Sequence, residues 1–242
     1  MTAIGISRGL SRELEALGFG PPVAWVYNPL RYARALHEAY LARYASAPRR
    51  VVFVGMNPGP WGMAQTGVPF GEVEAVRDWL SLKGAVGRPA REHPKRPVLG
   101  LDCARSEVSG RRLWGLMRAR FGTAERFFAG HFVANYCPLL FLDSGGANLT
   151  PDRVRRPERE SMLAICDAYL ARLLELLSPE WGIGVGRFAE QAVTRARALL
   201  PSAAARRLRV GGIPHPSPAN PAANRDWAER AEQVLVGLGV WD

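Results

Sequence analysis

The sequence predicts an α/β fold in which helices cover both faces of a central, mainly parallel four-stranded sheet. Short apolar runs rich in β-branched residues alternate with segments of helical periodicity. This alternation is typical of three-layer α/β domains. A length of 242 residues suits one large domain. We therefore predict a single domain over residues 1–242, with residues 1–22 as an N-terminal extension packed on it.

The first predicted elements are a helix and a buried strand. Asn28 and Pro29 are typical of an N-cap and a first helical residue. Apolar residues then recur at every fourth position, at Tyr32, Leu36, Tyr40 and Tyr44. We expect one helix that ends before Pro48. The run from Arg50 to Gly55 is apolar, β-branched and stopped by glycine, which predicts a buried parallel strand.

Three more strands and three more helices are predicted downstream. Strands are expected at residues 131–136, 181–185 and 208–213, and helices from Pro157, at residues 188–200 and near residues 227–238. The helix from Pro157 has an apolar face made by Met162, Ile165, Tyr169, Leu173 and Leu176. Ligands bind such sheets beyond the carboxyl ends of the strands. The loop after Gly55, the stretch Asn135–Pro138 and the loop after Ile213 should therefore meet at one rim.

The loop that follows the first strand is rich in glycine and proline. Residues 55–71 hold five glycines and three prolines, so we expect no regular structure there. The loop lacks the Gly-Lys-Ser/Thr ending of a phosphate loop and does not match the dinucleotide fingerprint. It is predicted to present Asn57, Gln65, Thr66 and Phe70. The alternative is a proline-stiffened connection without a functional role.

Two other rim segments carry candidate functional side chains. Two prolines bracket Ser217, which suits a rigid loop that pinches a phosphate backbone. His215 opens that loop; a lone histidine is more often structural, but its place at a strand end favours a function. Asn135 ends a predicted strand and could instead satisfy neighbouring backbone groups.

Charge and cysteine content limit the partners. The formal net charge is +10, and residues 81–120 hold ten Lys or Arg against three acidic residues. This favours a polyanionic partner such as DNA, although an arginine-preferring organism would also produce a basic surface. Cys103, Cys137 and Cys166 fit neither a zinc motif nor an iron–sulfur cluster and are expected to be buried thiols in a reducing compartment. No apolar run approaches the roughly 18 residues of a membrane span, and no export signal is recognised.

Long irregular segments of the chain resemble the single-strand-selective monofunctional uracil-DNA glycosylases, a branch of the uracil-DNA glycosylase superfamily. The resemblance covers roughly residues 23–240. The matching segments are Tyr27–Pro29, Gly55–Glu72, His93–Leu101, Ser106–Gly110, Asn135–Leu139, Gly184–Arg187, Ala189–Gln191, His215–Pro218 and Asn220–Pro221.

The resemblance implies a monofunctional enzyme of base excision repair. Such an enzyme hydrolyses the N-glycosidic bond of uracil, and of 5-hydroxymethyluracil, in single- and double-stranded DNA and leaves an abasic site. We expect a monomer that needs no cofactor, metal or iron–sulfur cluster and has no membrane partner. It would act in the bacterial cytoplasm at the nucleoid, or in the nucleus of a eukaryote.

The same resemblance implies a role for each rim residue. Asn135 reads the uracil edge and Phe70 stacks on the flipped base. The backbone near Gly59 and Met63 holds a water where the methyl group of thymine would sit. For catalysis, His215 donates to uracil O2 and Asn57 orients the attacking water.

The loop expected to enter the duplex departs from its relatives. Its DNA-binding residues are expected to be Ser217, Ala219, Asn220 and Arg225. Ala219 stands where relatives carry an arginine, which leaves the mode of strand opening in doubt; Trp61 stands where they carry a phenylalanine. Two alternatives remain: a mismatch-type or deaminated-purine (hypoxanthine or xanthine) glycosylase, and a non-catalytic module that binds damaged DNA.

Overall fold

A four-stranded parallel sheet lies at the centre of the molecule. The computed structural model describes residues 1–46, 48–218 and 224–242. The strand order is β3-β2-β6-β7, and all neighbours are parallel. The strands are β2 (Val51–Gly55), β3 (His131–Asn135), β6 (Trp181–Val185) and β7 (Arg209–Ile213). Every residue of β2, β3 and β6 is buried, as their continuous apolar runs predict.

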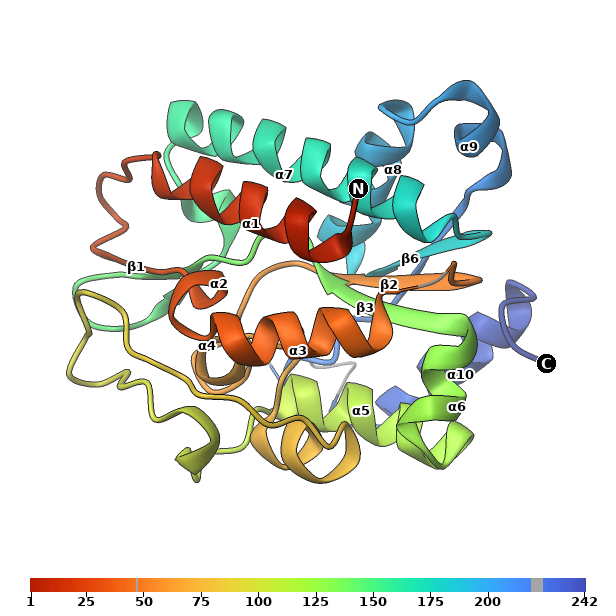
Figure 1. Cartoon of the computed structure of the whole chain (residues 1–242), viewed down its shortest axis with the longest axis horizontal. Coiled ribbons are helices and arrows are strands. Elements are labelled where there is room, and N and C mark those ends of the chain that lie inside the picture. The colour runs from red at the N-terminus through yellow and green to blue at the C-terminus, as the bar shows by residue number, and fades with distance from the viewer. Residues whose placement is uncertain (47, 219–223) are drawn as a thin grey trace.

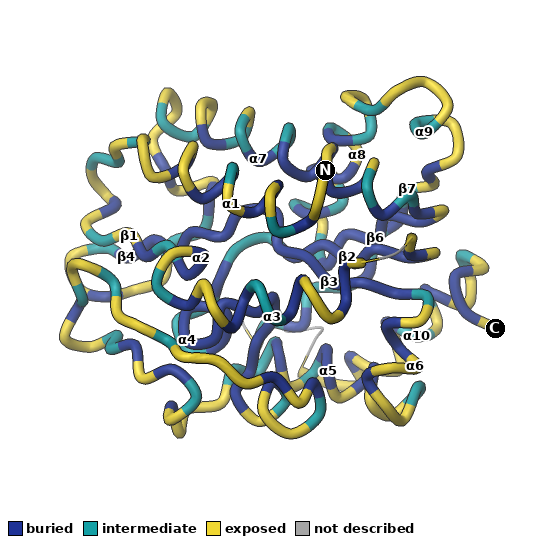
Figure 2. Tube along the Cα trace, in the orientation of Figure 1, coloured by how far each residue is buried: buried dark blue, intermediate teal, exposed yellow. Residues whose placement is uncertain are grey.

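Helices cover both faces of this sheet, so the predicted three-layer architecture is confirmed (Figure 1). In Figure 1 the upper layer contains α1 (Ala3–Glu15), α7 (Arg156–Leu177) and α8 (Arg187–Ala198). The lower layer contains α3 (Arg34–Tyr44), α5 (Val108–Phe121), α6 (Ala124–Gly130) and α10 (Trp227–Gly237). Figure 2 shows the sheet as the buried centre between them. The predicted strands and later helices agree with the observed ones to within two residues.

A second, small sheet was not predicted. It is antiparallel, has the order β1-β4-β5, and consists of β1 (Trp25–Tyr27), β4 (Leu140–Leu142) and β5 (Asn148–Leu149). Two- and three-residue strands carry no periodic signal, and the pairing of Trp25 with Leu142 joins distant parts of the chain. The remaining short helices are α2 (Pro29–Tyr32), α4 (Met63–Thr66), α9 (Ser202–Arg207), η1 (Ala75–Trp79), η2 (Gly100–Asp102) and η3 (Pro151–Arg153).

The single helix predicted from Asn28 is wrong, because the chain breaks at Ala33 into α2 and α3. Asn28 makes no side-chain cap and instead donates to Ser11 Oγ over 3.0 Å. Gly67 packs against the break so closely that a Cβ there would lie 3.0 Å from the Ala33 carbonyl oxygen. The four-residue spacing of apolar residues thus continues across two helices that a tertiary contact separates.

The prediction of no regular structure in the glycine-rich loop is also wrong over Met63–Thr66, which form α4. Gly67 ends this turn in a left-handed conformation with φ 72°, a common helix terminator. The short helix raises the middle of the loop toward the carboxyl edge of the sheet.

Candidate active site

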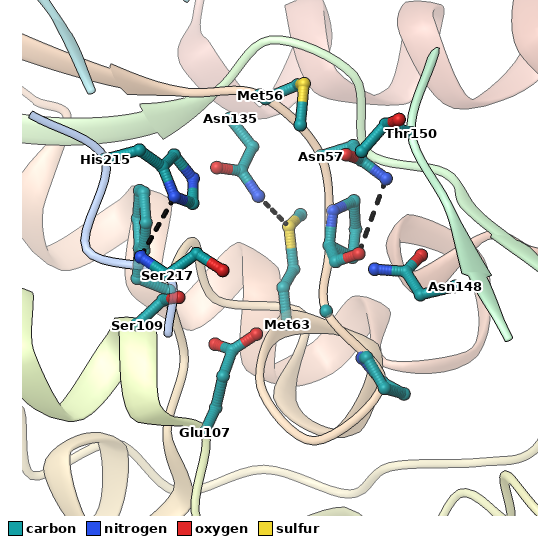
Figure 3. A pocket seen from close by; sticks show the side chains of 14 residues that line it. Met56, Asn57, Met63, Glu107, Ser109, Asn135, Asn148, Thr150, His215 and Ser217 are labelled. Carbon is teal, nitrogen blue, oxygen red and sulfur yellow. Dashed lines mark hydrogen bonds between the residues drawn. The ribbon is translucent and has the colours of Figure 1, made fainter. Parts of the chain in front are cut away.

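A pocket of about 330 Å³ opens at the carboxyl edge of the parallel sheet (Figure 3). It brings together seven of the residues predicted from the sequence: Asn57, Gly59, Met63, Phe70, Asn135, His215 and Ser217. The convergence of the three rim segments is therefore as expected. Seven further residues line it: Met56, Pro58, Pro60, Glu107, Ser109, Asn148 and Thr150.

Gly55 at the end of β2 lies where Phe70 and Asn135 come close together. It pairs in register with Asn135 at the end of β3. A Cβ on Gly55 would lie 2.3 Å from Asn135 Oδ1 and 2.5 Å from Phe70 Cε2. The absence of a side chain here allows the aromatic ring and the amide to approach each other.

Phe70 is held in place through its backbone. Its φ of 51° lies in the left-handed region, which non-glycine residues adopt rarely. The Phe70 carbonyl oxygen accepts from Trp114 Nε1 over 3.0 Å and from the Glu72 amide over 2.7 Å. A Cβ on Gly110 would lie 2.2 Å from the same oxygen, so helix α5 packs directly on this turn. The surrounding structure thus fixes an otherwise strained residue.

Asn135 is buried and faces the pocket with both ends of its amide. Its Nδ2 donates to Met63 Sδ over 3.0 Å, and a thioether is a weak acceptor. No described residue donates to its Oδ1. A bound ligand with one donor and one acceptor at the right spacing would therefore exchange a weak contact for two stronger ones.

Gln65 fixes the middle of the glycine-rich loop from inside. Its Nε2 donates to the Pro60 and Pro97 carbonyl oxygens, each over 2.9 Å. Its Oε1 accepts from the Leu99 amide over 2.8 Å. The side chain is 1% exposed, and its three partly buried bonds hold the loop against residues 97–99.

His215 enters the pocket from the chain that leaves β7. The Ser217 amide donates to its Nδ1 over 3.1 Å, which places the ring proton on Nε2 in the neutral form. Burial lowers the pKa of His215 and favours this neutral form. Gly186 supports the ring from behind, since a Cβ there would lie 3.0 Å from His215 Cβ.

Asn57 lies on the other side of Asn135 from His215 (Figure 3). Its Nδ2 makes a long hydrogen bond of 3.4 Å to the Pro58 carbonyl oxygen. Asn148 and Thr150 lie beside it and come from the small sheet, β5 and the residue after it. The sequence did not predict that these two residues line the pocket, because the two-residue strand β5 has no periodic pattern.

Glu107 is a further pocket residue that the sequence analysis did not identify. Its carboxyl lies against two glycines: a Cβ on Gly59 would be 2.0 Å from Oε1, and one on Gly62 would be 1.9 Å from Oε2. Burial and repulsion by Glu72 raise the pKa of Glu107 to about 7, although a hydrogen bond from the Gly59 backbone opposes this. Glu107 lies within Ser106–Gly110, one of the segments that resemble the family, and this position could have indicated a functional role.

The expected DNA-binding residues are not all gathered at the pocket. Ser217 lines it, whereas Arg225 is exposed and does not; Ala219 and Asn220 lie outside the described residues. Arg112 anchors the described flanks of this loop by donating to the Pro216 carbonyl over 2.7 Å and to Asn224 Oδ1 over 3.2 Å.

Within the described ranges, no cluster of three or more His, Cys, Asp or Glu side chains could hold a metal ion. No helix there is long and apolar enough to cross a membrane. The three cysteines are free and buried, as expected.

Known proteins resemble this chain along most of its length. The family model for the uracil DNA glycosylase superfamily matches residues 42–235. The single-strand selective monofunctional uracil-DNA glycosylase of Rattus norvegicus is 51% identical over 232 residues, which cover 96% of this chain and 82% of that protein. The Bos taurus protein of the same description is 51% identical over 96% of this chain and 84% of its own. These matches confirm the resemblance found in the sequence.

A solved structure has the same fold despite low identity. The crystal structure of wild-type SMUG2 from Pedobacter heparinus superposes with a TM-score of 0.64 and 16% identity, covering 98% of this chain and 99% of that one.

Proposed function

This chain belongs to the uracil-DNA glycosylase superfamily, and we propose on that basis that it is a monofunctional glycosylase that excises uracil from DNA in base excision repair. The observation that carries this proposal is the meeting of Phe70 and Asn135 over Gly55. A flat ring beside a buried amide is a slot for one planar base with a defined hydrogen-bonding edge. The base must leave its stack to reach the slot.

Asn135 would select uracil over cytosine by the polarity of its amide. Its Oδ1 can accept from uracil N3–H, while Nδ2 leaves Met63 Sδ and donates to uracil O4. Cytosine presents the opposite polarity at both atoms. Each mismatch would leave a buried polar group unpaired, at about 1–3 kcal/mol. Phe70 would add stacking that does not depend on base identity.

His215 and Asn57 would carry the chemical step from opposite sides of the base. The bond between uracil N1 and sugar C1′ breaks, and its electron pair moves onto the base. The neutral His215 donates from Nε2 toward O2, where the negative charge develops; one such donor contributes roughly 10²–10³ in rate. Asn57 orients a water toward C1′, and the proton released by that water balances the departing base. An amide is a poor proton acceptor, so the mechanism is dissociative.

Exclusion of thymine would depend on the turn that contains Gly59 and Met63. An ordered water there would be lost when a C5 methyl group enters, whereas the hydroxyl of 5-hydroxymethyluracil would replace its contacts. The structure adds Glu107 to this proposal, because its carboxyl already accepts from the Gly59 backbone. We propose that Glu107 positions this turn and that the water occupies the side of the pocket next to Met63.

A substrate panel with two variants tests the assignment. Release of uracil, 5-hydroxymethyluracil, thymine opposite guanine, hypoxanthine and xanthine is measured for the wild type, Asn57→Ala and His215→Leu. We expect uracil and 5-hydroxymethyluracil to be released, and each variant to lose about 10²–10³ in rate while DNA affinity changes little. Release of only a purine would favour the deaminated-purine alternative. Unchanged release in both variants would refute the assigned roles.

DNA is the partner that this activity requires, and we propose that the protein acts on it as a monomer without a cofactor or iron–sulfur cluster. Its place of action would be wherever the genome lies: the nucleus in a eukaryote, the nucleoid in a bacterium. Sedimentation of the free protein and of its DNA complex tests the monomer, and a dimer in either state would contradict it.

A further inference from the structure

A second cleft, of about 570 Å³, lies next to the base pocket and is lined by Trp61, Pro94, Lys95, Arg96, Pro97, Leu99, Cys103, Ala104 and Arg105. The residues that line the two cavities are neighbours along the chain at two places. Pro60 lines the base pocket and Trp61 lines the cleft; Glu107 lines the base pocket and Arg105 lines the cleft. A strand whose base occupies the first cavity therefore has a neighbouring nucleotide within reach of the second.

Positive charge in this cleft has no carboxylate to neutralise it. Lys95, Arg96 and Arg105 line it, and no acidic residue does. None of the ion pairs between described residues includes these three side chains, whereas an arginine such as Arg120 pairs with Glu232 over 2.7 Å. The buried Nε of Arg96 also lacks a hydrogen-bond partner among the described residues. Arg96 Nη1 donates to the Lys95 carbonyl oxygen over 3.1 Å, so Lys95, Arg105 and Nη2 of Arg96 are the donors that suit phosphate oxygens.

Trp61 holds two of these cations close to an aromatic surface. The guanidinium carbon of Arg105 lies 4.4 Å from the Trp61 ring centroid, and that of Arg96 lies 5.4 Å from it. Cation–π contact orients a guanidinium without consuming its N–H groups. The planar Arg105 guanidinium, held against Trp61, offers a stacking face for an unstacked base, and the cations around it suit the phosphate that follows.

Gln65 links the wall of the cleft to the loop that lines the base pocket. Its Nε2 donates to the carbonyl oxygen of Pro60, the residue that precedes Trp61 in the sequence, and to that of Pro97. Its Oε1 accepts from the Leu99 amide, and Pro97 and Leu99 both line the cleft. Binding of a nucleotide in the cleft would therefore order exposed side chains such as Lys95 and Arg105 but would not require the loop itself to be ordered, and it would assist placement of the uracil next to it.

We propose that Trp61, Lys95, Arg96 and Arg105 form a second nucleotide-binding subsite for an unpaired nucleotide on one side of the excised uracil. The inference rests on the proposed function, because it assumes that the base pocket receives uracil from a strand. It assigns the substrate strand, in unpaired form, as the occupant. Stacking on the Arg105 guanidinium that Trp61 supports requires a base that is not stacked and paired within a duplex.

The test uses single-stranded oligothymidine with one uracil, extended by one to four nucleotides on the 5′ side or on the 3′ side. For the wild type, kcat/KM should rise with extension on one side only. Trp61→Ala should remove about five- to tenfold on the extended strand and less on the short one, whereas Trp61→Phe should retain most of the gain. Lys95→Ala and Arg105→Ala should each reduce the salt slope of binding by about 0.7.

Lys83→Ala is the matched control, because it removes one charge from the same basic stretch but outside the cleft. Equal losses for Lys83→Ala and Lys95→Ala would overturn the subsite, as would equal losses on short and extended strands. The same loss for a fully paired duplex would also overturn it. Affinity for a uracil-free oligothymidine is measured in parallel. If the wild type bound the uracil-free strand through the cleft but released no uracil from the uracil-containing strand, the proposed function would be refuted and the subsite would remain supported.

Discussion

The two loops that form the pocket are held in different ways. The loop over residues 55–72 is fixed along its length by buried bonds, from Gln65 to Pro60 and Leu99 and from Trp114 to Phe70. The described part of the loop that begins at His215 receives hydrogen bonds from side chains of helices α5 and α10. Trp227 Nε1 donates to the Pro214 carbonyl over 2.8 Å, and Arg112 reaches the Pro216 carbonyl.

This difference matches the tasks that we propose for the two loops. The first loop carries Phe70, which would stack on the base, and Met63, which contacts the base-reading Asn135 of β3, so a shift of this loop would displace the groups that hold the base. Delivering one donor requires that His215 be correctly oriented, and the hydrogen bond from the Ser217 amide sets its tautomer. Substitutions in the first loop should therefore alter stability and activity together, and those at the second mainly activity.

The largest effect is expected at Gly55. In Gly55→Ala the new Cβ would collide with Asn135 Oδ1 and the Phe70 ring, which must shift apart. Because displacement of reacting groups by about 1 Å can reduce rates about 100-fold, we expect kcat/KM for uracil to fall by about that factor. Gly115→Ala is the matched control: nothing lies within 4 Å of its Cβ, so it should keep full activity. Full activity in Gly55→Ala would contradict the shared slot.

The next effect concerns the internal support of the first loop. Gln65→Leu would leave the Pro60 and Pro97 carbonyls and the Leu99 amide without their buried partner. We expect unfolding to become easier by about 2–4 kcal/mol in urea titrations, with a parallel fall in excision. The exposed Gln233→Leu loses a single bond of 3.4 Å to Glu229 and should change stability by less than about 0.5 kcal/mol. If the two variants were equally stable, the loop would not depend on Gln65.

Glu107 should make the stability of the first loop depend on pH. Its pKa is raised from 4.5 to about 7, so the stability it contributes is complete below pH 4.5 and is lost as pH rises through about 7. Glu107→Gln cannot ionise, and its melting temperature relative to the wild type should rise between pH 5 and pH 8. The free energy of unfolding of Glu107→Gln relative to the wild type should rise by at most about 3 kcal/mol over this range, since one pKa unit corresponds to about 1.4 kcal/mol.

Glu38→Gln provides the control for this pH dependence. A hydrogen bond from Arg8 lowers the pKa of Glu38 to about 2, so its stabilising effect is lost only as pH falls from 4.5 through 2. Its difference from the wild type should stay constant between pH 5 and pH 8. A Glu107→Gln difference that is equally constant would mean that this carboxyl does not titrate in that range.

The smallest effect is expected from the support of the second loop. Arg112→Ala removes the bonds to the Pro216 carbonyl and Asn224, contacts of about 1 kcal/mol at a partly exposed site. We expect uracil excision to fall roughly fivefold and the melting temperature to fall by at most about 2–4 °C. Its neighbour Arg111 bonds to Ser106 Oγ, so Arg111→Ala should leave excision unchanged. A stability loss in Arg112→Ala as large as that of Gln65→Leu would remove the distinction between the loops.

The sequence by itself determined the parallel sheet and the rim. Buried strands such as Val51–Gly55 are continuous apolar runs, and this local pattern is present in the sequence itself. Since parallel strands end at one edge, Asn57, Asn135 and His215 had to meet once those strands were recognised. The roles proposed for them come from the resemblance of long irregular segments, because spacing alone left structural alternatives open for each.

Only the tertiary structure decided how the pocket is shaped. It broke the helix at Ala33, paired Trp25 with Leu142 so that Asn148 reached the pocket, and placed Glu107 between two glycines. It also gathered Trp61 and Arg105 at one cleft. Each of these contacts joins residues with no common local pattern. Periodicity encodes which face of an element is buried, whereas close approaches between elements depend on how the whole chain packs.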